Sequence, residues 1–175
     1  MTSERLETGK GKIRSLSRRG TRSDKSPPVV RRSRRYTDPS ICGKCGSVYT
    51  SKTWRERRRL TPELMNRATW STCPACEQVG KGQYFGRVLL SGQYLLSHLD
   101  AIRARITNVE RRARFTQPER RVVAKDFDGD TLEVLTSSQK LAHRIAHEIE
   151  KAFGGRVSYS WADSDGTLRA TWYRD

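Results

Sequence analysis

The sequence lacks any long apolar run, and this absence narrows the classes of protein that fit it. No window of its 175 residues approaches the ~20 uninterrupted apolar residues of a transmembrane helix. The first forty residues are basic and hold no apolar segment of the kind found in secretory signal peptides. We therefore expect a soluble, cytoplasmic protein with no membrane partner.

Acidic residues are also scarce: 19 Asp and Glu stand against 35 Lys and Arg, which leaves a net charge of +16. The excess is uneven, because residues 1–41, 42–76 and 77–121 carry net charges of +8, +5 and +5, whereas residues 122–175 carry −2. Solubility alone does not require such a partition. A polyanion such as nucleic acid, bound by the first two thirds of the chain, would account for it.

Residues 1–41 have few apolar side chains, so they cannot bury enough area to offset the backbone entropy that folding removes. We predict a disordered basic arm that becomes ordered on nucleic acid. Two alternatives stay open for this arm, a solubilising tail and a weak nuclear-localisation signal. The arginines that we expect to contact phosphates lie in its last basic cluster: Arg31, Arg32, Arg34 and Arg35.

Cysteine is rare, with four in the chain, but its placement is regular. Cys42 and Cys45 form one CxxC pair, and Cys73 and Cys76 form a second pair after 27 intervening residues. Four thiolates suit one tetrahedral Zn²⁺ ion and leave no position for a catalytic water. We therefore expect one structural zinc per chain and no enzymatic activity, and no small-molecule substrate is evident. A redox pair and disulfides are the alternatives, although a thioredoxin-like site has one CxxC rather than two.

The insertion between the two cysteine pairs combines an aromatic residue with a run of arginines. Arginine forks bind phosphates and stack on bases, so we expect nucleic-acid contacts here. The alternative is a solvated loop in which the tryptophan packs on the zinc site. The candidate contact residues are Trp54, Arg55, Arg57, Arg58 and Arg59.

The remainder of the chain predicts an α+β fold. An apolar stripe with spacings of four and three predicts a long helix that ends at Pro118. After it, the turn signals Asp128-Gly129 and Asp165-Gly166 predict two hairpins on either side of a helix over residues 139–153. We expect this ββαββ unit to fold without zinc, as a small antiparallel sheet with one helix on a face. The stripe consists of Leu95, Leu99, Ile102, Ile106 and Val109.

The expected organisation is therefore a disordered basic arm (1–41), a four-cysteine zinc ribbon (42–88), a connecting amphipathic helix (89–117) and a ββαββ domain (118–175). Residues 82–87 read as a turn or short strand. Two further patterns are weak. Residues 126–130 resemble a calcium loop, but the glycine comes too early and a turn is favoured. His143 and His147 are four residues apart on a helix without the internal Glu of a metalloprotease, which favours a solvated face.

Residues 36–175 resemble a small bacterial zinc-ribbon family, on the two CxxC pairs, the long helix, and the segments TSSQKLA (136–142) and AFGG (152–155). That family is similar to the archaeal and eukaryotic adaptor that exports large ribosomal subunits from the nucleus in eukaryotes. The adaptor carries more CxxC pairs and binds more than one zinc, whereas only Cys42, Cys45, Cys73 and Cys76 match here. The resemblance implies contact with ribosomes or ribosomal RNA. Nuclear export is not implied, because no counterpart of the adaptor's later domains or export signals is present.

Together these patterns predict an RNA-binding zinc-ribbon protein that associates with ribosomes or ribosomal RNA, with ribosomal proteins as further candidate partners. The same charges would serve a DNA-binding transcriptional regulator, which is the alternative, although no recognition helix is evident. RNA binding would depend on unpaired nucleotides or 2′-hydroxyls, whereas a DNA regulator would prefer particular duplex sequences.

Overall fold

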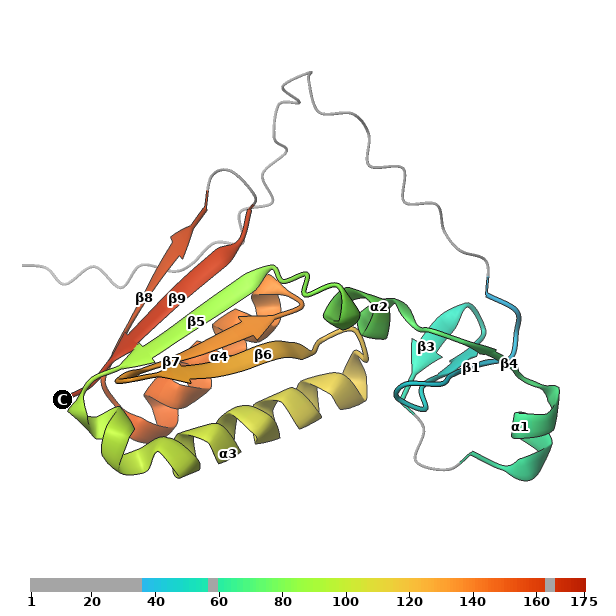
Figure 1. Cartoon of the computed structure of the whole chain (residues 1–175), viewed down its shortest axis with the longest axis horizontal. Helices are drawn as coiled ribbons and strands as arrows, with labels where there is room; N and C mark the ends of the chain where they lie inside the picture. Colours follow the sequence, from blue (N-terminus) through green and yellow to red (C-terminus); the bar gives the residue numbers. More distant parts are fainter. Residues whose placement is uncertain (1–35, 57–59, 163–165) are drawn as a thin grey trace, which may run out of the picture. The chain divides into compact units, whose positions relative to one another are not determined.

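The computed structural model describes residues 36–56, 60–162 and 166–175, and it has the expected mixture of helices and strands in two sheets (Figure 1). Residues 1–35 of the expected arm (1–41) lie outside the described residues. Ser40 and Ile41, at the end of that range, are instead buried in the first strand. None of the helices in the described part is both long and apolar enough to cross a membrane.

The first sheet holds the cysteine-bearing turns and has the strand order β3-β2-β1-β4. β1 pairs with β2 in the antiparallel sense and with β4 in the parallel sense. Ser51 and Lys52 both have positive φ, 52° and 62°, as the two central residues of a tight β2–β3 hairpin require. The strands of this sheet are β1 (Ser40–Cys42), β2 (Val48–Thr50), β3 (Thr53–Arg55) and β4 (Thr69–Ser71).

Two short helices accompany this sheet, α1 (Pro62–Arg67) and α2 (Pro74–Gly80). The Thr61 hydroxyl caps α1 by accepting from the Leu64 N–H, and Pro62 occupies the first turn. No residue of α1 is buried.

The second sheet has the order β6-β7-β5-β9-β8. β5 lies at its centre, antiparallel to β7 and parallel to β9. The strands are β5 (Gly86–Ser91), β6 (Val122–Asp128), β7 (Thr131–Thr136), β8 (Arg156–Trp161) and β9 (Leu168–Tyr173).

The central position of β5 corrects the expected ββαββ unit. The predicted hairpins β6–β7 and β8–β9 form, but they do not pair with each other, because β5 lies between them. Residues 82–87 were expected to be a turn or short strand, whereas β5 runs on to Ser91. Its alternate residues Gly86, Val88 and Leu90 are buried. The neighbours of β5 come from far along the chain, and periodicity within a segment does not reveal them.

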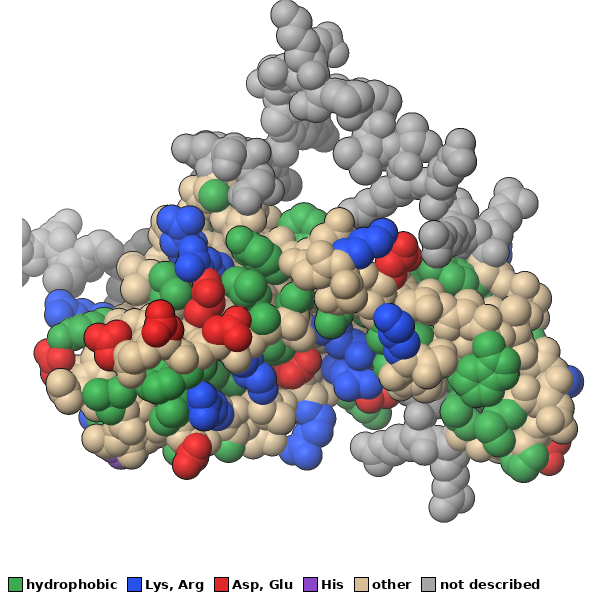
Figure 2. Space-filling view, viewed as in Figure 1, with side chains coloured by type: hydrophobic (Ala, Val, Ile, Leu, Met, Phe, Trp, Pro, Cys, Tyr) green, Lys and Arg blue, Asp and Glu red, His purple; other side chains and the backbone are tan. Residues whose placement is uncertain are grey.

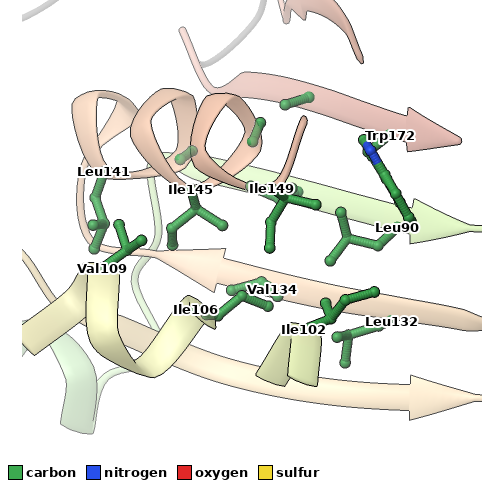
Figure 3. Packing of buried hydrophobic residues seen from close by; sticks show 14 of the residues in the cluster. Leu90, Ile102, Ile106, Val109, Leu132, Val134, Leu141, Ile145, Ile149 and Trp172 are labelled. Atoms are coloured by element: carbon green, nitrogen blue, oxygen red, sulfur yellow. The ribbon is translucent and has the colours of Figure 1, made fainter. Parts of the chain in front are cut away.

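Both longer helices, α3 (Gln93–Thr116) and α4 (Gln139–Phe153), contribute to one hydrophobic core with this sheet. Figure 3 shows Ile102 and Ile106 of α3 beside Leu132 and Val134 of β7. The predicted stripe of α3 is confirmed, with Leu99 partly buried and its other members buried. The expected connector over residues 89–117 is therefore part of the core of the second sheet, together with β5.

Candidate metal centre

The four cysteines lie in one cluster. Their sulfur atoms are all within 4.8 Å of one another, and the Sγ atoms of Cys45 and Cys73 are 3.7 Å apart. Four sulfurs at ~2.3 Å from a central Zn²⁺ would be separated by ~3.8 Å along each edge of the tetrahedron. The donor set and its size thus fit one metal ion. Within the described residues no other group of three or more His, Cys, Asp or Glu side chains comes together in this way.

Local backbone structure brings the two cysteine pairs together. Cys42 ends β1, and Gly46 closes the first turn with a hydrogen bond from its N–H to the Cys42 carbonyl at φ of 71°. Cys73 is the N-cap of α2 and Cys76 lies in its first turn. The parallel pairing of β1 with β4 sets Cys42 opposite Ser71, so the second pair begins beside the first. The spacing within each CxxC pair therefore brings two sulfurs together locally, and the pairing of β1 with β4 brings the two pairs together.

Hydrogen-bond donors surround the sulfurs. The backbone N–H of Cys73 donates to Cys42 Sγ and that of Cys76 donates to Cys73 Sγ, each over 3.4 Å. The hydroxyl of Ser47 lies 3.2 Å from Cys45 Sγ. Such donors reduce the excess negative charge of a site built from four thiolates.

A buried arginine of the second sheet's region also reaches this cluster. Nη2 of Arg121 donates to Cys45 Sγ over 3.4 Å, across 76 positions of sequence. Its Nε donates to the Pro118 carbonyl over 2.7 Å, and its backbone N–H donates to Ser137 Oγ over 2.7 Å. Burial lowers the pKa of Arg121, but the hydrogen bond to Cys45 and the nearby sulfur charges outweigh burial and raise it. Arg121 therefore stays protonated and places a fixed positive charge against the sulfurs.

The thiols of the cluster differ in pKa. The hydrogen bond with Cys73 lowers the pKa of Cys45 to about 3, and the same hydrogen bond raises the pKa of Cys73. Burial raises the pKa of Cys76 to about 11. The cysteine whose pKa is lowered is the one whose sulfur Arg121 contacts. A divalent ion bound by four thiolates would displace the thiol protons.

Trp54 packs against the cysteine cluster. Its ring lies 5.0 Å from that of Tyr36 and 5.5 Å from that of Tyr49, so the three aromatic rings form a cluster of their own. The indole Nε1 is buried and has no hydrogen-bond partner among the described residues. The alternative to nucleic-acid contact, in which the tryptophan packs on the cysteine site, predicted this position for Trp54. The next residue, Arg55, is exposed.

The other arginines predicted to bind nucleic acid lie outside the described residues. These are Arg31, Arg32, Arg34, Arg35, Arg57, Arg58 and Arg59.

Two further polar contacts join the cysteine-bearing region to the second sheet's region. Nε2 of Gln78, on α2, donates to the Ser137 carbonyl over 2.9 Å. Glu56 and Arg114, at the end of α3, form an ion pair of 3.3 Å. Sequence reasoning missed these contacts and Arg121, because nothing in a local pattern distinguishes one arginine among 35 basic residues.

The two weak patterns have the outcomes favoured from the sequence. Asp128 ends β6 at the β6–β7 turn, where Gly129 has φ of 60°. His143 and His147 are exposed, and the His143 ring stacks on Tyr159 with 4.8 Å between ring centres.

No protein-family model matches this sequence, and no curated protein is significantly similar to it.

Proposed function

We propose that this chain is an RNA-binding zinc protein that associates with ribosomes or ribosomal RNA in the cytoplasm. Zinc is the metal that best suits four thiolates in a site of tetrahedral size. Because sulfur would occupy all four positions, the metal would support the fold and take no part in catalysis.

One observation carries the proposal: the residue before the arginine run is anchored on the cysteine cluster. Trp54 packs against that cluster from β3, and the exposed Arg55 follows it directly. Arg57, Arg58 and Arg59 come next in the sequence, ahead of the cap at Thr61. Arginines attached to a metal-fixed anchor lose less chain entropy on binding than arginines in a free tail.

The charge distribution supports a polyanionic partner for the same region. Residues 36–81 hold eight basic and four acidic residues, and residues 1–35 hold twelve and three. Residues 122–175, in contrast, hold seven basic and nine acidic residues. Phosphate contacts by the first two regions would release counterions and make binding depend steeply on salt. The resemblance to the ribosomal adaptor makes ribosomal RNA the first RNA to test.

Sedimentation of the tagged, zinc-loaded protein through a sucrose gradient tests this proposal most directly. We expect it to travel with ribosomal particles at low salt and to remain at the top of the gradient after a rise in salt. Cys73→Ser is the matched variant, which should stay at the top at both salt concentrations. A wild-type protein that never leaves the top, or that prefers a particular duplex DNA sequence, would contradict the proposal. The second result would favour the DNA-binding alternative.

A further inference from the structure

Trp70 is an exposed tryptophan on the cysteine-bearing sheet. Its side chain is 58% exposed, whereas Trp172 is fully buried in the core of the second sheet. Tryptophan has the largest apolar area of any side chain, so leaving it in water forgoes much of the stabilisation that burial would provide. An exposed indole in a folded region therefore suggests a surface that is covered by a partner.

The indole is seated on the metal-binding turns. Trp70 pairs with Ile41 in the β1–β4 ladder, one position before Ser71 pairs with Cys42. A Cβ atom on Gly43 would lie 3.9 Å from Cε3 of Trp70, so the ring edge lies against the first CxxC turn where that turn has no side chain. Cys73 follows three residues later. One edge of the ring thus lies against the first CxxC turn, and the chain runs on from Trp70 to the second CxxC pair.

The exposed side chains of the cysteine-bearing region are both apolar and basic. Met65 of α1 is 37% exposed, and Figure 2 shows hydrophobic side chains gathered over the end of the molecule that holds α1 and β4. Lys44, next to Gly43 in the sequence, and Arg67, at the end of α1 three residues before Trp70, are both exposed. An exposed aromatic face in a basic region matches a nucleotide, whose base is apolar on its faces and whose phosphate is negative.

We propose that Trp70 is a stacking platform for an unpaired base of RNA, and that exposed basic residues of the same region, such as Lys44 and Arg67, contact the adjoining phosphates. This inference rests on the proposed RNA binding and specifies its substrate as single-stranded RNA. Bases inside a duplex are stacked on one another and cannot cover the indole. Because Trp70 lies on a strand that is paired with β1, a base that stacks on its ring orders little additional backbone.

The test compares two equally exposed tryptophans in the full-length, zinc-loaded protein. Trp161 is 60% exposed but lies on β8, in the acidic part of the chain, and Trp161→Ala is the matched control. The probes are a short labelled oligouridylate without self-structure and an RNA duplex of the same length. Trp70→Ala should weaken oligouridylate binding about tenfold and duplex binding less than about twofold, since each stacked base contributes measurably to affinity. Trp161→Ala should change neither.

Two further variants separate stacking from folding. Trp70→Phe keeps an aromatic face and should retain most of the affinity, whereas Trp70→Leu keeps only apolar bulk and should behave like Trp70→Ala. Zinc content is measured for each variant. Equal oligouridylate affinity for Leu and Trp, or equal losses on oligouridylate and duplex, would overturn the stacking role while leaving RNA binding intact. If the wild-type protein binds neither RNA, the proposed function itself fails.

Discussion

The cysteine-bearing region and the second sheet are stabilised in different ways. The second sheet and two helices pack together through one continuous apolar core, to which all five strands contribute. The first sheet has strands of three residues each, and apart from the cysteines its buried apolar side chains are few: Ile41, Val48 and Ala75. Such a small core cannot offset the backbone entropy of ordering the region. We infer from this comparison that metal binding would supply the missing free energy in the first region, whereas the second region needs no metal.

Removal of one candidate metal ligand should unfold the first region and leave the second region folded, which is the largest difference that we expect between them. Cys73→Ser should abolish zinc binding, because a three-sulfur site loses most of the metal's affinity, and residues 40–81 should unfold. The second sheet should keep its structure. Metal analysis and amide hydrogen exchange, resolved by region, measure both effects. Zinc bound at full stoichiometry, or two zinc ions per wild-type chain, would contradict a single closed site.

Two fragments test which segments the second sheet needs in order to fold without zinc. Residues 86–175 contain every strand and helix of the second sheet, so this fragment should fold without zinc. Residues 122–175 lack β5 and α3, and should not fold, contrary to the sequence-based expectation for the ββαββ unit. The buried faces of β7 and β9 would be left without the strand that joins them. Cooperative thermal unfolding followed by circular dichroism is the measurement. A cooperative transition in the shorter fragment would show that β5 is dispensable.

Replacement of Arg121 tests the hydrogen bond that joins the second sheet's region to the cysteine cluster. Arg121→Met removes the guanidinium that donates to Cys45 but keeps similar bulk. Loss of a residue that supports a metal ligand should reduce zinc affinity ~10–100-fold. Loss of a buried hydrogen bond to a charged group should also lower the free energy of unfolding by ~1.5–3 kcal/mol.

Competition with a chelator measures the zinc affinity of this variant. Arg120→Met is the matched control, since Arg120 is adjacent but partly exposed. Equal zinc affinity of the two variants would show that Arg121 does not support the site.

The smallest effect should separate Arg57, Arg58 and Arg59, which follow Trp54 and Arg55 in the sequence, from the arginines of the N-terminal segment. Replacement of Arg57, Arg58 and Arg59 by Ala should weaken ribosomal RNA binding several-fold more than the same change at Arg31, Arg32 and Arg34. Both variants lose three charges, so the slope of log affinity against log salt should fall by ~2 in each, at ~0.7 per phosphate contact. Titrations at several salt concentrations give the slopes, and the affinities at one of these concentrations rank the two variants. A larger loss from the N-terminal variant would make the zinc region a spacer and the arm the binding element.

The clustering of the four cysteines could be predicted from the sequence because the spacing within each pair is local. Each CxxC spacing places two sulfurs on one tight turn, and no other residues of the chain repeat that pattern. The stripe on α3 and the two hairpins were predictable for the same reason. Helical periodicity and turn signals act between residues a few positions apart.

Contacts between distant segments were decided only by the tertiary structure. β5 is a short apolar run whose place at the centre of the sheet depends on β7 and β9, which follow it by some forty and eighty residues. Arg121 meets Cys45 across 76 positions, and Trp70, on the edge strand β4, is left 58% exposed. Periodicity reports which face of a segment is apolar, but only packing determines what that face meets. The sequence by itself therefore determined the candidate metal donors and the local helices and turns. Only the tertiary structure decided that Arg121 contacts Cys45 and that Trp70 lies against the first CxxC turn, because both contacts join segments that are far apart in the sequence.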